Sequence, residues 1–229
     1  MIRNAVLALA FAAATSAASA AELNVPVGGF DRIALGSAAE VVVTTGRGPS
    51  FHASGDQSAL DRLDIRVVDG VLQIGTKRGG WFNWSEHGHI RIAVTVPMVR
   101  GLSLGGSGTI KVDRIKVPSF TAELGGSGTI AIAALDAGKT DFSLGGSGNL
   151  SATGSCESAS ASVGGSGSLQ LGTLKCQTLD ASVGGSGRVE AFASRNAALS
   201  IAGSGDIVVR GGAHCAISKV GSGSARCIA

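Results

Sequence analysis

The chain has 229 residues, of which 36 are glycine and only 4% are aromatic, and it contains no tyrosine. So few large side chains exclude a wide globular core, whereas a narrow core of stacked Ala, Val, Ile and Leu fits this supply. The formal net charge is +3 and no basic run occurs, so the sequence lacks the electrostatic footprint of a nucleic-acid-binding protein.

Residues 1–20 have the pattern of a secretory signal peptide. A short positive start containing Arg3 precedes the apolar stretch 5–14, and Ala18-Ser19-Ala20 is an A-x-A cleavage site. The apolar stretch is too short to span a membrane. We therefore expect a mature chain that begins near Ala21 and is exported to the bacterial periplasm or the cell exterior, with no integral membrane segment. Without Arg3 it holds 18 basic and 16 acidic residues.

Residues 21–100 lack a repeat but contain short apolar-polar alternations that predict strands. The sequence Val68-Asp69-Gly70-Val71 predicts a hairpin, because Asp-Gly suits a type I′ turn. The segment 59–64 predicts one helical turn, and Leu35-Gly36-Ser37 resembles a degenerate corner. We expect this region to form the first rungs and an N-terminal cap. Its predicted strands are 32–35, 40–45, 64–68, 71–76 and 89–96.

The loop 77–89 is the one local anomaly, since it holds both tryptophans and two of the four histidines. Exposed aromatic side chains can stack on sugar rings or anchor a partner. We weigh three roles for this segment: a cap on the apolar end of the fold, which we favour, a recognition patch, and a metal site that uses Glu86 with the histidines. The candidate recognition residues are Trp81, Phe82, Trp84, His87 and His89.

Residues 101–229 contain the tripeptide Gly-Ser-Gly seven times, at intervals of 18 to 20 residues. A fixed period of this length predicts stacked units that bury their apolar faces only against their neighbours. Apolar residues alternate with polar ones on both sides of each tripeptide, as in Leu102-Ser103-Leu104, which is the period of a half-buried strand. We expect the glycines to form sharp corners between about three short strands per repeat.

The predicted fold is therefore all-β: a single-chain parallel β-solenoid, or β-helix-like stack, with rungs of ~18–20 residues. The regular part spans 101–229 and ends in a C-terminal cap, where Lys219 occupies an inward position and should discourage edge-to-edge pairing. The predicted structural corners are Gly106-Ser107-Gly108, Gly126-Ser127-Gly128, Gly146-Ser147-Gly148, Gly165-Ser166-Gly167, Gly185-Ser186-Gly187, Gly203-Ser204-Gly205 and Gly221-Ser222-Gly223.

The seven serines suggest either a nucleophile or a hydroxyl ladder for sugars, but a tight corner that needs a small polar residue is the favoured explanation. A nucleophile needs an adjacent base, and the repeats contain one histidine, His214. Calcium-binding rolls place Asp in every turn, whereas here only Asp206 directly follows a Gly-Ser-Gly. We therefore expect no catalytic residue, no metal site and no cofactor in the repeats.

The four cysteines predict disulfides, because their number is even and the chain is expected to be exported. Cys156 and Cys176 each lie ten residues before a corner serine, so adjacent rungs should place them within disulfide range. Cys215 and Cys227 fall at inward positions of the last turn. A bond between them would staple that end, although different corners could separate them.

The chain resembles the head GIN domain family ("putative auto-transporter adhesin", a domain of unknown function) over residues 30–223. The resemblance depends on Val68-Asp69-Gly70-Val71-Leu72-Gln73-Ile74, on Ala93-Val94-Thr95-Val96-Pro97 before Leu102-Ser103-Leu104, and on the order of the Gly-Ser-Gly corners. It implies a β-solenoid domain on exported bacterial proteins. It transfers no catalytic residue to this chain.

The leading functional hypothesis is a non-enzymatic, adhesion-like module that binds a glycan or an envelope or surface protein through its outer face. Self-association through an open end stays a further option. One alternative is a carbohydrate-active β-helix enzyme, which would need clustered carboxylates. The outward acids are scattered instead, at Glu123, Asp141, Glu157 and Glu190. A second alternative is a structural or envelope-stress protein without a small-molecule ligand.

Overall fold

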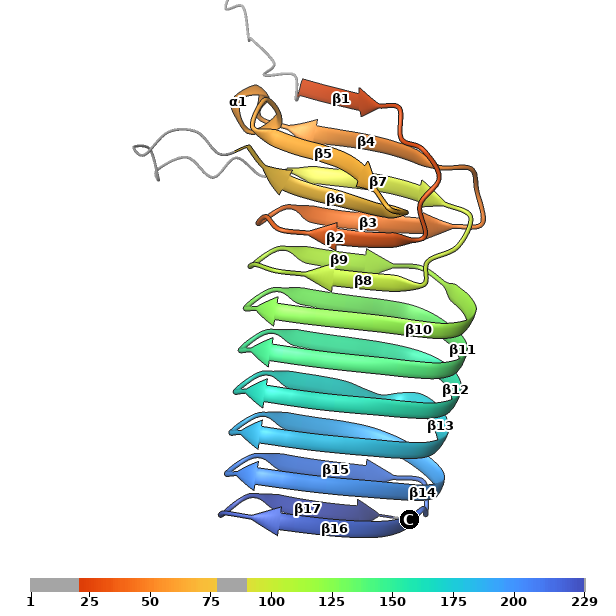
Figure 1. Ribbon diagram of the computed structural model, residues 1–229, viewed down its shortest axis with the longest axis vertical. Helices are drawn as coiled ribbons and strands as arrows, with labels where there is room; N and C mark the ends of the chain where they lie inside the picture. Colours follow the sequence, from red (N-terminus) through yellow and green to blue (C-terminus); the bar gives the residue numbers. More distant parts are fainter. Residues whose placement is uncertain (1–20, 78–89, 229) are drawn as a thin grey trace, which may run out of the picture.

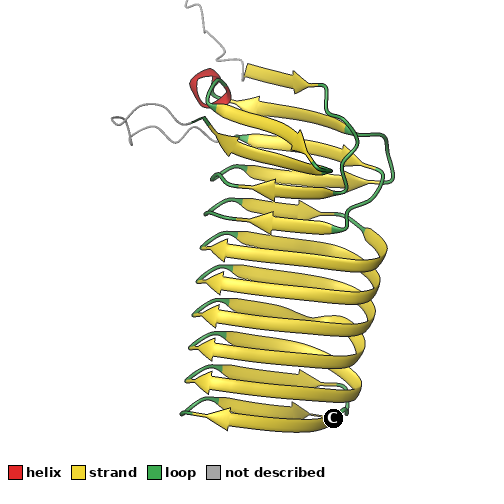
Figure 2. Cartoon of the chain, in the orientation of Figure 1, coloured by secondary structure: helices red, strands yellow, loops and turns green. Residues whose placement is uncertain are grey.

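The computed structural model describes residues 21–77 and 90–228. The chain winds into a stack of flattened coils, with the N-terminal strands at one end and the C-terminal strands at the other (Figure 1). Almost every residue of the stack lies in a strand, and one short helix covers the N-terminal end (Figure 2). The predicted parallel β-solenoid is confirmed.

The described chain has 17 strands and one helix. They are β1 (Ala21–Val25), β2 (Arg32–Leu35), β3 (Glu40–Thr45), β4 (Ser50–Gly55), α1 (Gln57–Leu60), β5 (Leu63–Val68), β6 (Val71–Thr76), β7 (Arg91–Val96), β8 (Gly101–Leu104), β9 (Thr109–Val112), β10 (Ile115–Gly126), β11 (Thr129–Gly146), β12 (Asn149–Gly165), β13 (Ser168–Gly185), β14 (Arg188–Gly203), β15 (Asp206–Arg210), β16 (His214–Val220) and β17 (Ser224–Ile228).

Each coil has two sides rather than the three short strands expected. The front side carries Leu102-Ser103-Leu104 and its copies, and the back side carries Ile110 and its copies. At one edge, here called the corner edge, a Gly-Ser-Gly turn joins front to back. At the other, the bend edge, β11 to β14 run from the back to the front without leaving strand structure (Figure 1). Each coil is therefore a flattened loop with one sharp corner and one gradual bend.

Parallel pairing in register places equivalent residues above one another. Leu104, Leu124 and Leu144 form one column, and each is at most 1% exposed. Strict apolar-polar alternation directs one set of side chains between the two sides and the other set outward. The small aliphatic residues that dominate the sequence thus fill a narrow core between the front and the back.

The N-terminal cap consists of antiparallel strands. β1 pairs with β4, and β4 pairs with β7. β5 and β6 form the predicted hairpin, in which Asp69 and Gly70 have φ values of 50° and 74°, as a type I′ turn requires. The predicted helical turn is displaced, because α1 begins at Gln57 and buries Ala59 and Leu60 against the cap.

The order of the coils in space differs from their order in the sequence. β2 lies between β6 and β8, and β3 lies between β7 and β9. Leu35-Gly36-Ser37 acts as a corner, since the Gly105 amide donates to the Leu35 carbonyl at 2.8 Å and the Thr109 amide to the Ala39 carbonyl at 3.0 Å. Residues 32–45 are thus the coil on which the regular stack rests.

The C-terminal end is open within the described residues, where β16 and β17 pair only with β14 and β15. Ile217 is 50% exposed although its column is buried in the coils above it. Lys219 continues the column of Val183 and Ile201, but it is exposed because no described coil follows. Over the described chain, no helix has the length and apolar character to cross a membrane.

Candidate functional site

The corner edge is built by close backbone contact between coils. A Cβ placed on Gly126 would come within 2.5 Å of the Gly106 carbonyl oxygen, and one on Gly128 within 2.5 Å of the Gly108 carbonyl oxygen. Real Cβ atoms do not approach oxygen so closely, so these two glycines are needed for stacking in every corner from Gly126-Ser127-Gly128 onward. The preceding glycine is different: at Gly125 a Cβ would meet nothing within 4 Å. Its equivalents in later coils are Ala202 and Val220.

The corner serines form a single file of exposed residues along this edge. Their backbone amides hold the stack together, as when Ser127 donates to the Gly106 carbonyl at 3.2 Å and Ser147 to the Gly126 carbonyl at 3.0 Å. His214 lies at the start of β16, which is the bend edge, opposite the corners. The fold therefore separates this histidine from the corner serines, whose backbone amides bond adjacent coils.

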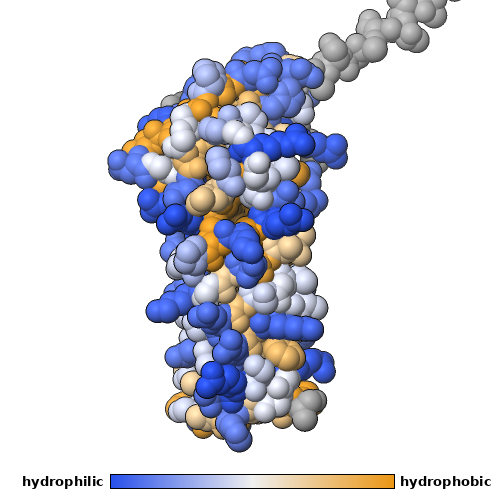
Figure 3. All heavy atoms as spheres, turned by 90° about the vertical axis from the view of Figure 1, so that its right-hand side faces the viewer, coloured by the Kyte–Doolittle hydropathy of each residue, from blue (hydrophilic) through white to orange (hydrophobic). Residues whose placement is uncertain are grey.

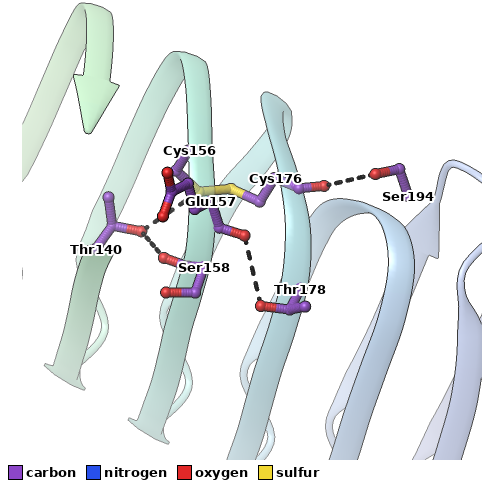
Figure 4. Close-up of a disulfide and its surroundings, with 7 residues drawn as sticks. All are labelled: Thr140, Cys156, Glu157, Ser158, Cys176, Thr178 and Ser194. Carbon is purple, nitrogen blue, oxygen red and sulfur yellow. Dashed lines mark hydrogen bonds between the residues drawn. A yellow bond between two sulfur atoms is a disulfide. The ribbon is translucent and has the colours of Figure 1, made fainter. Parts of the chain in front are cut away.

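Cys156 and Cys176 form a disulfide between adjacent coils at the bend edge (Figure 4). They are paired in register, and their Cα atoms are 4.5 Å apart. The Thr140 hydroxyl, which is buried, donates to the Ser158 carbonyl at 3.3 Å, and the Ser194 hydroxyl donates to the Cys176 carbonyl at 3.4 Å. The disulfide and these hydrogen bonds tie four successive bends, from β11 to β14.

The second predicted disulfide is also present. Cys215 lies on β16 and Cys227 on β17, and their Cα atoms are 6.6 Å apart. The bond crosses from the front to the back side of the last coil. It therefore closes the coil that has a neighbour on only one side.

The predicted recognition segment lies outside the described residues. Trp81, Phe82, Trp84, His87 and His89 all fall within 78–89. The chain enters this segment after β6 and leaves it before β7, two strands of the N-terminal cap. Within the described ranges, no three His, Cys, Asp or Glu side chains gather as a group that could hold a metal ion.

The four acids considered for the enzyme alternative lie on different parts of the surface. Glu123 and Asp141 are on the front side, Glu190 is on the back side, and Glu157 is at the bend edge. The alternative of a carbohydrate-active enzyme requires a pair of carboxylates, and both would have to lie on the same side of the stack. Glu123 and Asp141 are diagonal neighbours on adjacent strands of the front side, since Asp141 pairs with Thr121.

Among the acids, Glu40 has the clearest electrostatic environment. Lys111 donates a hydrogen bond to its carboxylate at 2.7 Å, and Arg91 lies 3.5 Å away. The hydrogen bond and charge of Lys111, with a smaller contribution from Arg91, lower the pKa of Glu40. These residues come from β3, β9 and β7, so this network joins three neighbouring strands on the outside of the stack.

Solved structures share this fold. A structure titled putative adhesin from Bacteroides fragilis has 21% identity and a TM-score of 0.84, and the match covers 92% of this chain and 98% of that one. One titled putative lipid binding protein from Parabacteroides distasonis has 22% identity, a TM-score of 0.72, and coverage of 93% and 97%. At such identities the likeness establishes the fold alone.

A search of curated proteins finds no match to this chain. The family described as "Putative auto-transporter adhesin, head GIN domain" matches residues 29–213. That match covers most of the chain and nearly all of its stacked coils. The chain therefore belongs to the head GIN domain family.

Proposed function

We propose that this chain is an exported, non-enzymatic binding module that presents a rigid surface to a glycan or an envelope protein. The observation that carries the proposal is the front side of the stack, whose outward column is polar and nearly free of bulky groups. It consists of Ser103, Glu123, Ser143, Ser162, Ser182, Ser200 and Ser218, in register on successive strands. A regular polar surface on an extended scaffold suits binding through a large contact area.

Export is supported by the two disulfides and by the signal-peptide pattern of residues 1–20. Disulfides persist in oxidising compartments such as the bacterial periplasm or the cell exterior. The adhesin description of the family agrees with a role outside the cytoplasm.

Trp81 and Trp84, with Phe82, His87 and His89, are the residues we assign to recognition. The support is compositional: both tryptophans of the chain lie within four residues of each other. Tryptophan presents a large flat apolar face and a polar edge, which suits stacking on a sugar ring. The neighbouring strands β6 and β7 belong to the N-terminal end of the stack, so this assignment places recognition at one end of the module.

The experiment is a glycan-array screen of the purified mature chain beside a Trp81→Ala/Trp84→Ala variant. Binding that the variant loses, while its melting temperature is unchanged, supports the aromatic segment as the recognition site. Binding that the variant retains moves recognition to the stacked coils. If the intact chain binds no glycan or envelope extract, the binding proposal is wrong and a structural role is favoured.

A further inference from the structure

The fold gathers charge onto the bend edge. This edge comprises the segments 28–31, 46–49, 97–100, 113–118, 133–139, 153–158, 172–178, 192–196 and 210–214. The corner tripeptides at the opposite edge contain no charged residue. The chain after the predicted cleavage site has 18 basic and 16 acidic residues. The bend edge holds eight of the basic and four of the acidic residues, so the rest of the chain holds ten basic and twelve acidic residues. The bend edge is therefore positive, and the rest of the molecule is negative.

The basic residues of this edge are all exposed and extend along the stack. They are Arg47, Arg100, Arg114, Lys116, Lys139, Lys175, Arg195 and Arg210. They come from the bends of successive coils, except that the bend 153–158 contains no basic residue. With a strand spacing of ~4.8 Å, the row is roughly 30 Å long. The sequence contains no basic run because each repeat contributes at most two of these side chains.

Most of these charges are available to a ligand. Within the described residues, Arg100 pairs with Asp31 and Lys116 with Asp136, whereas the other six cations make no ion pair. The Asp113 carboxylate is already used, because it accepts the amides of Thr45 at 3.0 Å and Arg114 at 2.6 Å. Glu157 lies in the same row, in the coil between those of Lys139 and Lys175, and is the one acid of the edge with no such partner among the described residues. Because cations still outnumber acids along the edge, the row attracts a polyanion.

Apolar groups lie between the charges. Figure 3 faces this edge and shows hydrophilic side chains on both sides of a strip of paler and apolar residues. Met98, at the connection from β7 to β8, is 43% exposed, and Phe192 is partly exposed at the bend of β14. Sugar rings present apolar faces next to their polar groups, so this combination favours an acidic polysaccharide over a polymer that exposes only phosphates.

We propose that the bend edge binds a linear acidic polysaccharide, with its carboxylates along the row of cations and its chain parallel to the stack axis. One carboxylate per sugar gives a charge spacing of the same order as the spacing between coils. This surface is distinct from the aromatic segment, and the tryptophan variant retains every charge on it. The two proposals can therefore fail independently.

The test measures binding of the mature chain to polygalacturonate at several NaCl concentrations. The matched ligand control is fully methyl-esterified polygalacturonate, which has the same backbone without the charge. Lys175→Gln/Arg195→Gln removes two edge cations, and Arg62→Gln/Arg66→Gln removes two exposed cations from the N-terminal cap. We expect the edge variant to bind polygalacturonate about three- to tenfold more weakly, as two exposed ion pairs would predict, and the cap variant to match the unmodified chain.

Three results would overturn the proposal. Equal binding of the esterified polymer would mean that the carboxylates are not recognised. Equal losses in the edge and cap variants would assign the effect to net charge rather than to the bend edge. A single-stranded DNA of similar length that binds as tightly, with the same dependence on Lys175 and Arg195, would show that the edge does not select a polysaccharide.

Discussion

Phe120 and Phe142 pack against each other across adjacent strands, with ring centroids 6.3 Å apart and ring planes tilted by 59°. Both are at most 1% exposed. Phe142 stacks between Ala122 and Ala161 in its own column, so small neighbours leave the volume that the ring fills. A core with almost no aromatic residues therefore depends on this pair at the second and third regular coils.

Replacing Phe142 with alanine should lower the free energy of unfolding by about 3–5 kcal/mol, because alanine neighbours cannot collapse into the cavity. Denaturant unfolding measures the change. The control is Phe192→Ala at the bend edge, where the ring is partly exposed and the loss should be smaller. Equal losses would contradict the packing argument.

The two kinds of corner glycine should respond differently to alanine. Gly126→Ala should destabilise the stack by about 1–3 kcal/mol, because its Cβ would overlap the Gly106 carbonyl. Gly125→Ala should stay within about 0.5 kcal/mol, since its Cβ points into open space. Thermal melting of the two variants tests the difference, and a stable Gly126→Ala protein would refute the close-contact argument.

Loss of either disulfide should lower stability by a similar amount, because the stabilisation depends only weakly on the length of the closed loop. The Cys156–Cys176 bond spans 20 residues and the Cys215–Cys227 bond spans 12, and loops of this size correspond to about 3 kcal/mol each in the chain-entropy model. The measurement is the melting temperature of each paired Cys→Ala variant. Detection of free thiols in the native, unreduced protein would contradict both pairings.

The Glu40 network should contribute stability that depends on pH. Because Lys111 lowers the pKa of Glu40 below its ordinary value of 4.5, the stabilisation is present above that value and is lost as the pH falls through the lowered pKa. Lys111→Met should move the pKa of Glu40 back toward 4.5 and reduce the stability difference between pH 7 and acid. An NMR titration of the Glu40 carboxyl checks the shift, and an unchanged titration would contradict it.

The regular coils could be predicted because two independent signals coincide in them. The alternation around Leu102-Ser103-Leu104 defines the strand, and the tripeptide that follows defines the corner. The bend gives no such signal, since strand structure continues through it in β11 to β14. Because nothing in the sequence marks the bend as part of a continuous strand, the repeat length predicted a third short strand. The structure has two sides joined by the bend instead.

The N-terminal region was harder to predict because its pairings are non-local. The strand β4 was missed, since its sequence, SFHASG, is poor in β-branched residues and its pairing with β7 joins segments about 40 residues apart. The position of β2 between β6 and β8 also depends on tertiary contacts that no local pattern encodes. The basic edge could not be predicted from the sequence for a related reason: basic residues that occur at most twice per repeat form a row only when the coils stack.

Register stacking also makes the length of this protein adjustable. A coil such as 128–147 pairs in the same register with the coil on either side, so an added repeat could continue this pairing without changing the cap or the disulfide-closed end. Each added repeat lengthens the front side and the bend edge together by one strand spacing. Gene duplication within the repeat region would thus set the reach of the module in steps, while the ends stay the same.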